Sequence, residues 1–278
     1  MSVKRNLGFF AILLAFIFCP GLLHAEGLKL TSRSAILMDM NTGEILYSHN
    51  ADERMQPASI TKILTLYMVD EDIQHNGTRL SDPVRISRNA WRTGGSKMFI
   101  QVGSEIPLDE LLKGIAVISA NDASVAVAEH IAGSVEAFVA KMNQKARELG
   151  MFNSNFRNPN GLPAKGQFTT ARDMLVLAYK YLDRFPEAIN LHSVQRYTYR
   201  NITQHNRNTL LRNYPDADGL KTGWVAAAGY HIIATAKRGN TRLIAVVMGA
   251  KSPGIRSREA KKLLNKGFRM IDGSQRQG

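Results

Sequence analysis

Pro57-Ala58-Ser59-Ile60-Thr61-Lys62 is the stretch from which the fold of this 278-residue chain can be worked out. It contains an S-x-x-K motif, and apolar residues behind it recur at helical spacing, which predicts a helix from about Ser59 to Asp72. Side chains three residues apart share one face of a helix, so Lys62 is expected beside the Ser59 hydroxyl. A serine becomes a nucleophile when a base takes its proton, and a lysine can be that base only in its neutral form.

Two further short motifs follow along the chain. Ser119-Ala120-Asn121 reads S-x-N at the junction of two predicted helices, and Lys221-Thr222-Gly223 reads K-T-G on a predicted strand. Lys221 would supply a cation that lowers the pKa of Lys62, and the absence of a side chain at Gly223 would let a substrate backbone lie close. Taken singly, each motif also fits an ordinary helix cap or a solvated lysine. All three in this order indicate one site.

Strands are predicted at both ends of the chain and helices in its middle. A hairpin is expected over 34–49, and Asp218-Gly219 is expected to form a turn before the K-T-G strand. The remaining predicted elements are strands at 230–237 and 242–249 and helices at 108–118, 120–132, 135–149, 170–182 and 258–271. This order predicts an α/β (α+β) fold in which a mixed, mainly antiparallel sheet is flanked by helices and an all-helical subdomain is inserted at about 75–185.

The first 25 residues have the composition of a targeting signal. Two basic residues precede an apolar run, Leu7 to Phe18, that is too short for an ordinary membrane span, and Ala25 offers a cleavage point. We predict a signal peptide over 1–25 and a single domain over 26–278 with no second domain after it; an uncleaved membrane anchor is the alternative. The only cysteine, Cys19, lies in the signal segment, so the mature chain would contain neither a disulfide nor a thiolate nucleophile.

The composition limits the classes of partner and cofactor. The formal net charge is +13 at pH 7, and a basic exported protein tends to associate with anionic polymers or lipid headgroups. Lysine and arginine are spread along the chain without a nucleic-acid-binding motif, so we expect no nucleic acid partner, and membrane association only through the basic surface or an uncleaved N-terminus. The histidines are scattered and no glycine-rich phosphate loop follows a strand, so we expect no metal and no cofactor.

With these motifs the chain resembles the D-alanyl-D-alanine carboxypeptidases, low-molecular-mass penicillin-binding proteins of the S11 peptidase type. The resemblance covers about residues 30–271 and implies a β-lactamase/transpeptidase-like fold. Further stretches that carry it are Leu111-Leu112-Lys113-Gly114, Asn158-Pro159-Asn160-Gly161-Leu162, Thr170-Ala171-Arg172-Asp173-Met174, Gln204-His205-Asn206-Arg207-Asn208 and Ala228-Gly229-Tyr230.

The resemblance implies a serine DD-carboxypeptidase that removes the terminal D-alanine from peptidoglycan stem pentapeptides. Ser59 would attack the carbonyl between the two D-alanines, Lys62 would take its proton, and water would hydrolyse the acyl-enzyme. Ser119 would relay a proton toward the leaving amine. The backbone N–H groups of Ser59 and Trp224 would form the oxyanion hole, and β-lactam antibiotics would acylate the same Ser59.

The same resemblance implies a set of substrate-binding residues. Asn121 would hold the substrate backbone, while Lys221, Thr222 and Arg256 would bind near the terminal carboxylate, which a guanidinium suits well. Trp224 stands where small or imidazole side chains are common in the family, so its indole is expected to narrow the choice of substrate.

Two other functions remain compatible with the same motifs. A DD-endopeptidase that cuts peptidoglycan crosslinks would use identical chemistry, and a non-catalytic cell-wall-binding protein could keep the fold. A class A β-lactamase is disfavoured, because no glutamate between Asn121 and Lys221 has the context of a deacylating base. Many relatives continue into a β-rich second domain and a membrane anchor, whereas this chain stops at Gly278. We therefore expect an exported enzyme of the periplasm or cell envelope.

Overall fold

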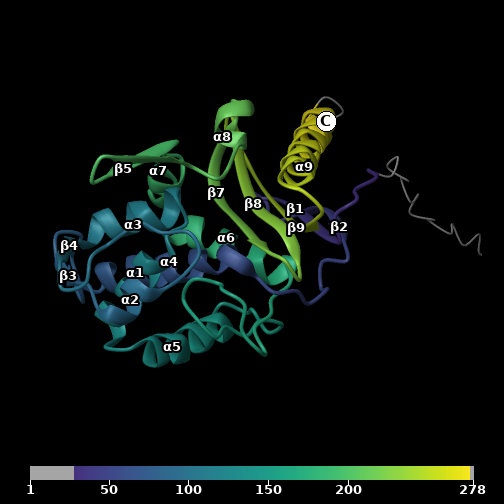
Figure 1. Cartoon of the computed structure of the whole chain (residues 1–278). Coiled ribbons are helices and arrows are strands. Elements are labelled where there is room, and N and C mark those ends of the chain that lie inside the picture. Colours follow the sequence, from purple (N-terminus) through teal and green to yellow (C-terminus); the bar gives the residue numbers. More distant parts are fainter. Residues whose placement is uncertain (1–27, 276–278) are drawn as a thin grey trace, which may run out of the picture. The chain divides into compact units, whose positions relative to one another are not determined.

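A five-stranded sheet in which every pair is antiparallel forms the centre of the fold (Figure 1). The structure is a computed structural model that describes residues 28–275, so the predicted signal peptide lies outside the described residues and stays a prediction. The strand order is β2-β1-β9-β8-β7, which confirms a sheet built from both ends of the chain. Its strands are β1 Ser34–Asp39, β2 Ile45–His49, β7 Ala217–Val225, β8 Gly229–Arg238 and β9 Thr241–Ala250.

Helices cover both faces of this sheet. The C-terminal helix α9, Pro253–Gln275, packs against β1, β8 and β9 on one side, and α6, Ala171–Arg184, packs against β1 and β9 (Figure 1). The central strands are therefore buried on both faces, and β9 is a continuous apolar run from Leu243 to Met248. The side chain of Thr170 begins α6 by accepting a hydrogen bond from the backbone N–H of Asp173, the usual role of threonine at a helix N-cap.

The chain between β2 and β7 is mainly helical, as predicted. Gly133, with φ +77°, ends one helix in the left-handed conformation, and Ser134 caps the next. Besides α6, the α-helices in this part are α1 Lys62–Gln74, α2 Arg88–Arg92, α3 Leu108–Val117, α4 Asn121–Ala132, α5 Val135–Glu148, α7 Ala188–His192 and α8 Leu210–Asn213. Two small hairpins lie among them, β3 Pro83–Arg85 with β4 Glu105–Pro107 and β5 Arg196–Tyr199 with β6 Ile202–His205. Among residues 28–275 no single helix could cross a membrane, and only the bent pair α4–α5 meets that test by length and composition.

Three local predictions were wrong. Ser59 lies in a short 3-10 turn, η1 Ala58–Thr61, and the α-helix begins only at Lys62. The last helix begins at Pro253 instead of 258, because the Ser252 hydroxyl caps it and proline suits a first helical position. Asp218-Gly219 belongs to β7, beside a register shift, and does not form a turn. The boundaries of a helical subdomain at about 75–185 stay a prediction.

Candidate active site

The three sequence motifs meet at the junction between η1, the start of α4 and the edge strand β7. The Nζ of Lys62 lies 2.9 Å from the Oγ of Ser59, 2.7 Å from the Oδ1 of Asn121 and 2.6 Å from the backbone O of Asn160. Lys62 is fully buried, whereas Ser59 is partly exposed. The predicted contact between Lys62 and the Ser59 hydroxyl is therefore confirmed, although Ser59 stands on a 3-10 turn and not on an α-helix.

The acceptors around Lys62 orient its amine. The Nδ2 of Asn121 donates to the backbone O of Gly94, so its Oδ1 faces Lys62. That Oδ1 and the carbonyl of Asn160 can only accept hydrogen bonds, so they take two N–H groups of the amine. In a neutral lysine the remaining lone pair then faces the Oγ of Ser59. This geometry suits a base poised on the serine proton.

The electrostatics of the site favour neutral Lys62. Burial, followed by the positive charge of Lys221, lowers the pKa of Lys62 well below its usual range, and Asp122 opposes this shift. Burial and the guanidinium groups of Arg256 and Arg207 lower the pKa of Lys221 to about 7. The site concentrates cations around one buried carboxylate, so it suits an anionic substrate group.

Ser119 lies on the short junction between α3 and α4, as predicted. Its backbone has φ +63°, a left-handed conformation that costs a residue with a side chain about 1–3 kcal/mol. Its Oγ is buried and has no hydrogen-bond partner within the described part of the chain, and Ser119 lines the same pocket as Ser59. The Ser119 hydroxyl therefore has its hydrogen-bonding capacity left for a molecule bound in the pocket.

Asp122 anchors the loop opposite the S-x-N junction. Its buried carboxylate accepts hydrogen bonds from the backbone N–H groups of Met98 and Phe99, and Ser96 accepts one from the backbone N–H of Asn121. Because both partners come from one loop, Asp122 fixes the position of Ser96 in the pocket wall. No role for Asp122 was predicted from the sequence.

Two glycines allow the elements to approach closely. Gly161 has φ +81°, and a Cβ placed on it would lie 1.8 Å from the backbone O of Ala58. A Cβ on Gly223 would lie 2.9 Å from the backbone N of Ser59. Only glycine fits at either position. The motif glycine Gly223 therefore brings β7 against the nucleophile turn, and the expected space for a substrate backbone lies along the outer edge of β7.

The site opens into a pocket of about 430 Å³. Six predicted site residues line it: Ser59, Ser119, Thr222, Gly223, Trp224 and Arg256. The other three, Lys62, Asn121 and Lys221, are buried behind these walls. Five lining residues had been given no role: Ser96, Arg207, Thr209, Tyr230 and Pro253. Arg207 and Tyr230 lie within sequence stretches that carry the family resemblance, so these stretches could have indicated that both residues belong to the site.

Arg256 reaches the pocket from the first turn of α9. It is 5% exposed, its Nε has no hydrogen-bond partner among the described residues, and its Nη2 donates to the backbone O of Arg207 at 3.4 Å. Arg256 is thus a buried residue of the pocket wall and not a surface arginine. On the rim, Trp224 is 55% exposed, and the centroid of its ring lies 5.8 Å from that of Tyr230.

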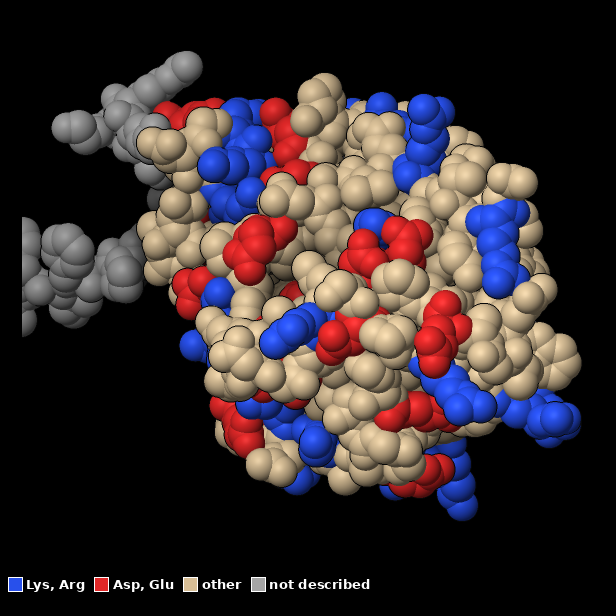
Figure 2. Space-filling model, turned by 90° about the vertical axis from the view of Figure 1, so that its left-hand side faces the viewer, with Lys and Arg blue, Asp and Glu red and all other residues tan. Residues whose placement is uncertain are grey.

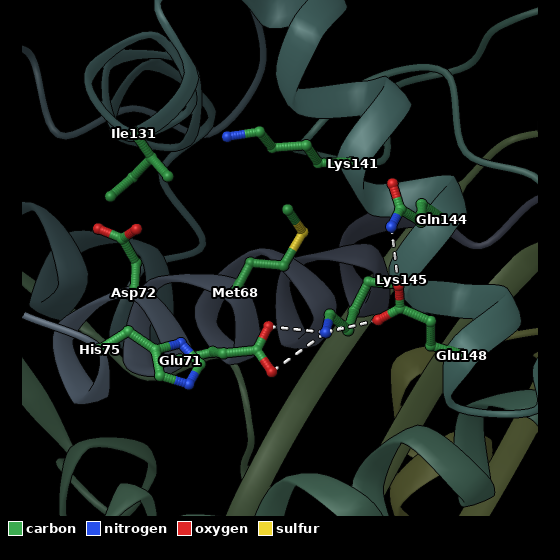
Figure 3. A pocket seen from close by; sticks show the side chains of 9 residues that line it. All are labelled: Met68, Glu71, Asp72, His75, Ile131, Lys141, Gln144, Lys145 and Glu148. Carbon is green, nitrogen blue, oxygen red and sulfur yellow. Dashed lines mark hydrogen bonds and ion pairs between the residues drawn. The ribbon is translucent and has the colours of Figure 1, made fainter. Parts of the chain in front are cut away.

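A second pocket, between α1 and α5, has no such chemistry. Figure 3 shows Lys145 between the carboxylates of Glu71 and Glu148, with ion-pair distances of 2.9 and 2.7 Å. Its charged side chains largely neutralise one another, and its lining contains no serine, threonine or cysteine. The pocket at Ser59 is therefore the candidate active site.

Comparison with known proteins finds a matching family and similar solved structures. The model of the D-alanyl-D-alanine carboxypeptidase family, peptidase S11, matches residues 23–252. The D-alanyl-D-alanine carboxypeptidase DacC of Escherichia coli strain K12 is 41% identical over 268 residues, which cover 92% of this chain and 67% of that protein. Penicillin binding protein 5 of Haemophilus influenzae has a TM-score of 0.85 and 39% identity, over 87% of this chain and 72% of that chain. Penicillin-binding protein D2 of Listeria monocytogenes, solved with ampicillin bound, has a TM-score of 0.80 and 29% identity, over 87% of this chain and 99% of that chain.

Proposed function

The chain belongs to the peptidase S11 family of D-alanyl-D-alanine carboxypeptidases, and from this premise we propose that Ser59 is the nucleophile of a serine DD-carboxypeptidase. The enzyme removes the terminal D-alanine from peptidoglycan stem pentapeptides. The observation that carries the assignment is the 2.9 Å contact between the Oγ of Ser59 and the Nζ of a fully buried Lys62. A protein that only bound wall peptides would have no use for a serine with its own base.

In the first step the Oγ of Ser59 bonds to the carbonyl carbon between the two D-alanines. Its proton passes to the lone pair of Lys62, and the oxygen of the tetrahedral intermediate receives hydrogen bonds from the backbone N–H groups of Ser59 and Trp224. Backbone N–H groups that already point at the developing negative charge stabilise it strongly, because they need not reorganise during the reaction.

In the second step the bond between the carbonyl carbon and the leaving nitrogen breaks. The proton held by Lys62 moves through the Ser119 hydroxyl to that nitrogen, so D-alanine leaves as a neutral amine. The unpaired Oγ of Ser119 supports this role. Water then attacks the ester on Ser59, and Lys62 again serves as the base, which restores the serine and releases the tetrapeptide.

The wall of the pocket suits the terminal D-alanine. Thr222 and the guanidinium of Arg256 bind its carboxylate, and the charge of Lys221 attracts it from behind the strand. Because β7 is the edge strand of the sheet, an extended stem peptide can pair with its outer side. Asn121 was predicted to hold the peptide, but it is buried and its amide is already bonded to Lys62 and Gly94, so we assign it to orienting Lys62 instead. A β-lactam presents a similar carboxylate and a reactive carbonyl, so it inhibits the enzyme by acylating Ser59.

We also propose that the enzyme works in the periplasm or cell envelope after removal of residues 1–25. The basic and apolar composition of that segment supports export, as does a substrate that belongs to the cell wall. Retention by a basic surface gains no support from the face shown in Figure 2, where acidic and basic side chains alternate. The intact mass of protein recovered from the envelope fraction tests cleavage: a chain that begins at Glu26 is expected, and an uncleaved chain would overturn the proposal.

Defined muropeptides test the reaction. The parent, Ser59→Ala and the control Ser81→Ala, at an exposed serine, are incubated with pentapeptide monomers and with crosslinked dimers, and products are followed by mass. Loss of one D-alanine from the monomer by the parent and the control, but not by Ser59→Ala, is expected. Cleavage of dimers with monomers untouched would make the protein an endopeptidase. No Ser59-dependent cleavage of either would make it a binding protein on a catalytic fold.

A further inference from the structure

His231 is a fully buried histidine that the reaction described above does not use. It lies on β8 directly opposite Gly223 of the K-T-G strand. Its Nδ1 accepts a hydrogen bond from the backbone N–H of Gly249 at 3.0 Å, and its Nε2 lies 3.0 Å from the backbone O of Gln56. The imidazole therefore joins the segment that leads to Ser59 to strand β9.

These two contacts define the tautomer of the imidazole ring. Because Nδ1 accepts a hydrogen bond it carries no proton, so Nε2 carries the proton and donates it to the carbonyl of Gln56. Burial lowers the pKa of His231 to about 4, so the ring is neutral at physiological pH. Nδ1 therefore acts only as an acceptor and Nε2 only as a donor.

Both groups that bond to the ring are backbone groups, and each finds its hydrogen-bond partner in this side chain. The pairing of β8 with β9 shifts register between Tyr230 and Ile232, so a β-bulge leaves the buried N–H of Gly249 without a strand partner. Gln56 stands immediately before Pro57-Ala58 and three residues before Ser59. The imidazole satisfies both groups and sets the distance between them.

We propose that His231 is a positioning residue for acylation, which it assists by holding the Gln56 carbonyl and so keeping the backbone of Ser59 against Gly223. This inference rests on the proposed function of Ser59. Since an added Cβ on Gly223 would come within 2.9 Å of the backbone N of Ser59, these two backbones have little freedom to move without opening the oxyanion hole. A misplacement of about 1 Å at such a site can slow a reaction about 100-fold.

Two substitutions separate the two hydrogen bonds. In His231→Asn the amide oxygen stands near the position of Nδ1 and can still accept from Gly249, while the bond to Gln56 is lost. In His231→Gln the amide nitrogen reaches the position of Nε2 and can still donate to Gln56, while the bond to Gly249 is lost. Each variant loses one buried hydrogen bond, so similar falls in the unfolding temperature are expected. The two variants are therefore matched in stability and differ in whether the hydrogen bond to the Gln56 carbonyl is kept.

The rate of acylation by a fluorescent penicillin and the amide hydrogen exchange of residues 57–62 are measured in full-length parent and variants. We expect His231→Asn to acylate about 10- to 100-fold more slowly, with faster exchange in that segment, and His231→Gln to stay close to the parent in both. Equal slowing in both variants, or no slowing in His231→Asn, would overturn the proposal for His231. A parent that penicillin does not acylate would instead overturn the proposed function, while the exchange measurement still decides whether His231 holds the segment.

Discussion

Replacing Lys221 with methionine should make the protein more stable while it loses activity. Lys221 is 2% exposed, and its Nζ donates to the backbone O of Thr222 at 3.1 Å. Lowering its pKa from 10.5 to about 7 on folding corresponds to a penalty of about 5 kcal/mol. Methionine keeps an unbranched side chain of similar length without the charge. After the loss of one hydrogen bond, worth about 1 kcal/mol, Lys221→Met should gain about 4 kcal/mol at pH 7 and below.

The gain should depend on pH in a defined direction. The folded state holds the pKa of Lys221 below its unfolded value, so between about pH 7 and pH 10.5 the unfolded parent binds more protons than the folded parent. The parent therefore becomes more stable as pH rises through this window. The methionine variant lacks that dependence, so its advantage should be greatest at pH 7 and below and should fall to zero or slightly below zero near pH 10.5, where only the lost hydrogen bond remains.

Denaturant unfolding of parent and variant across this pH range measures the difference. Lys237→Met, at an exposed lysine on β8, is the matched control and should change stability little at any pH. A variant less stable than the parent at pH 7, or a difference that does not change with pH, would refute the argument that burial of this charge is costly.

The same substitution should change the pH profile of acylation. The charge of Lys221 is the second cause that lowers the pKa of Lys62, so without it Lys62 should stay protonated to a higher pH. The acidic limb of the rate of acylation by fluorescent penicillin should move to higher pH. An unmoved limb would show that burial alone keeps Lys62 neutral.

Three further predictions follow from single contacts. Gly161→Ala should lose about 2 kcal/mol or more of stability and acylate slowly, because its Cβ would strike the carbonyl of Ala58 at a positive φ; a urea unfolding curve like that of the parent would contradict this. Asp122→Asn should lose about 1–3 kcal/mol of stability, since the side-chain NH₂ group would face the backbone N–H of Met98, which is also a donor. Faster proteolysis of the 94–100 loop in the variant is the measurement that checks this. Arg256→Lys should raise KM for a pentapeptide about tenfold with kcat retained, because a lysine cannot bind the carboxylate through two nitrogens; a change confined to kcat would argue against that role.

Much of the fold could be predicted because its signals are local. The hairpin at 34–49, the paired strands near the C-terminus and the helices between them each follow from apolar spacing and capping residues close in sequence. The errors also have local causes. The positive φ of Ala58 lies outside the right-handed helical region, and only a short 3-10 turn precedes the α-helix that begins at Lys62. Ser252 with Pro253 begins the last helix early.

The residues that act through distant contacts had no local signal. The carbonyl of Asn160, which orients Lys62, is 98 residues away from it in sequence, and the contact of His231 with Gln56 spans 175 residues. Histidines scattered along a chain usually lie at the surface or in packing positions, and nothing near His231 sets it apart. Its role depends on a β-bulge, which arises only when β8 and β9 pair.

By itself the sequence determined which chemical groups this protein has and in what order they stand, because S-x-x-K, S-x-N and K-T-G are set by covalent spacing. Only the tertiary structure decided how those groups behave. Burial of Lys62 and the nearby charge of Lys221 lower the pKa of Lys62. Gly161 and Gly223 let two distant segments of the chain pack against the turn that carries Ser59. Desolvation and charge proximity depend on distances through space, and such distances are not encoded by spacing along the chain.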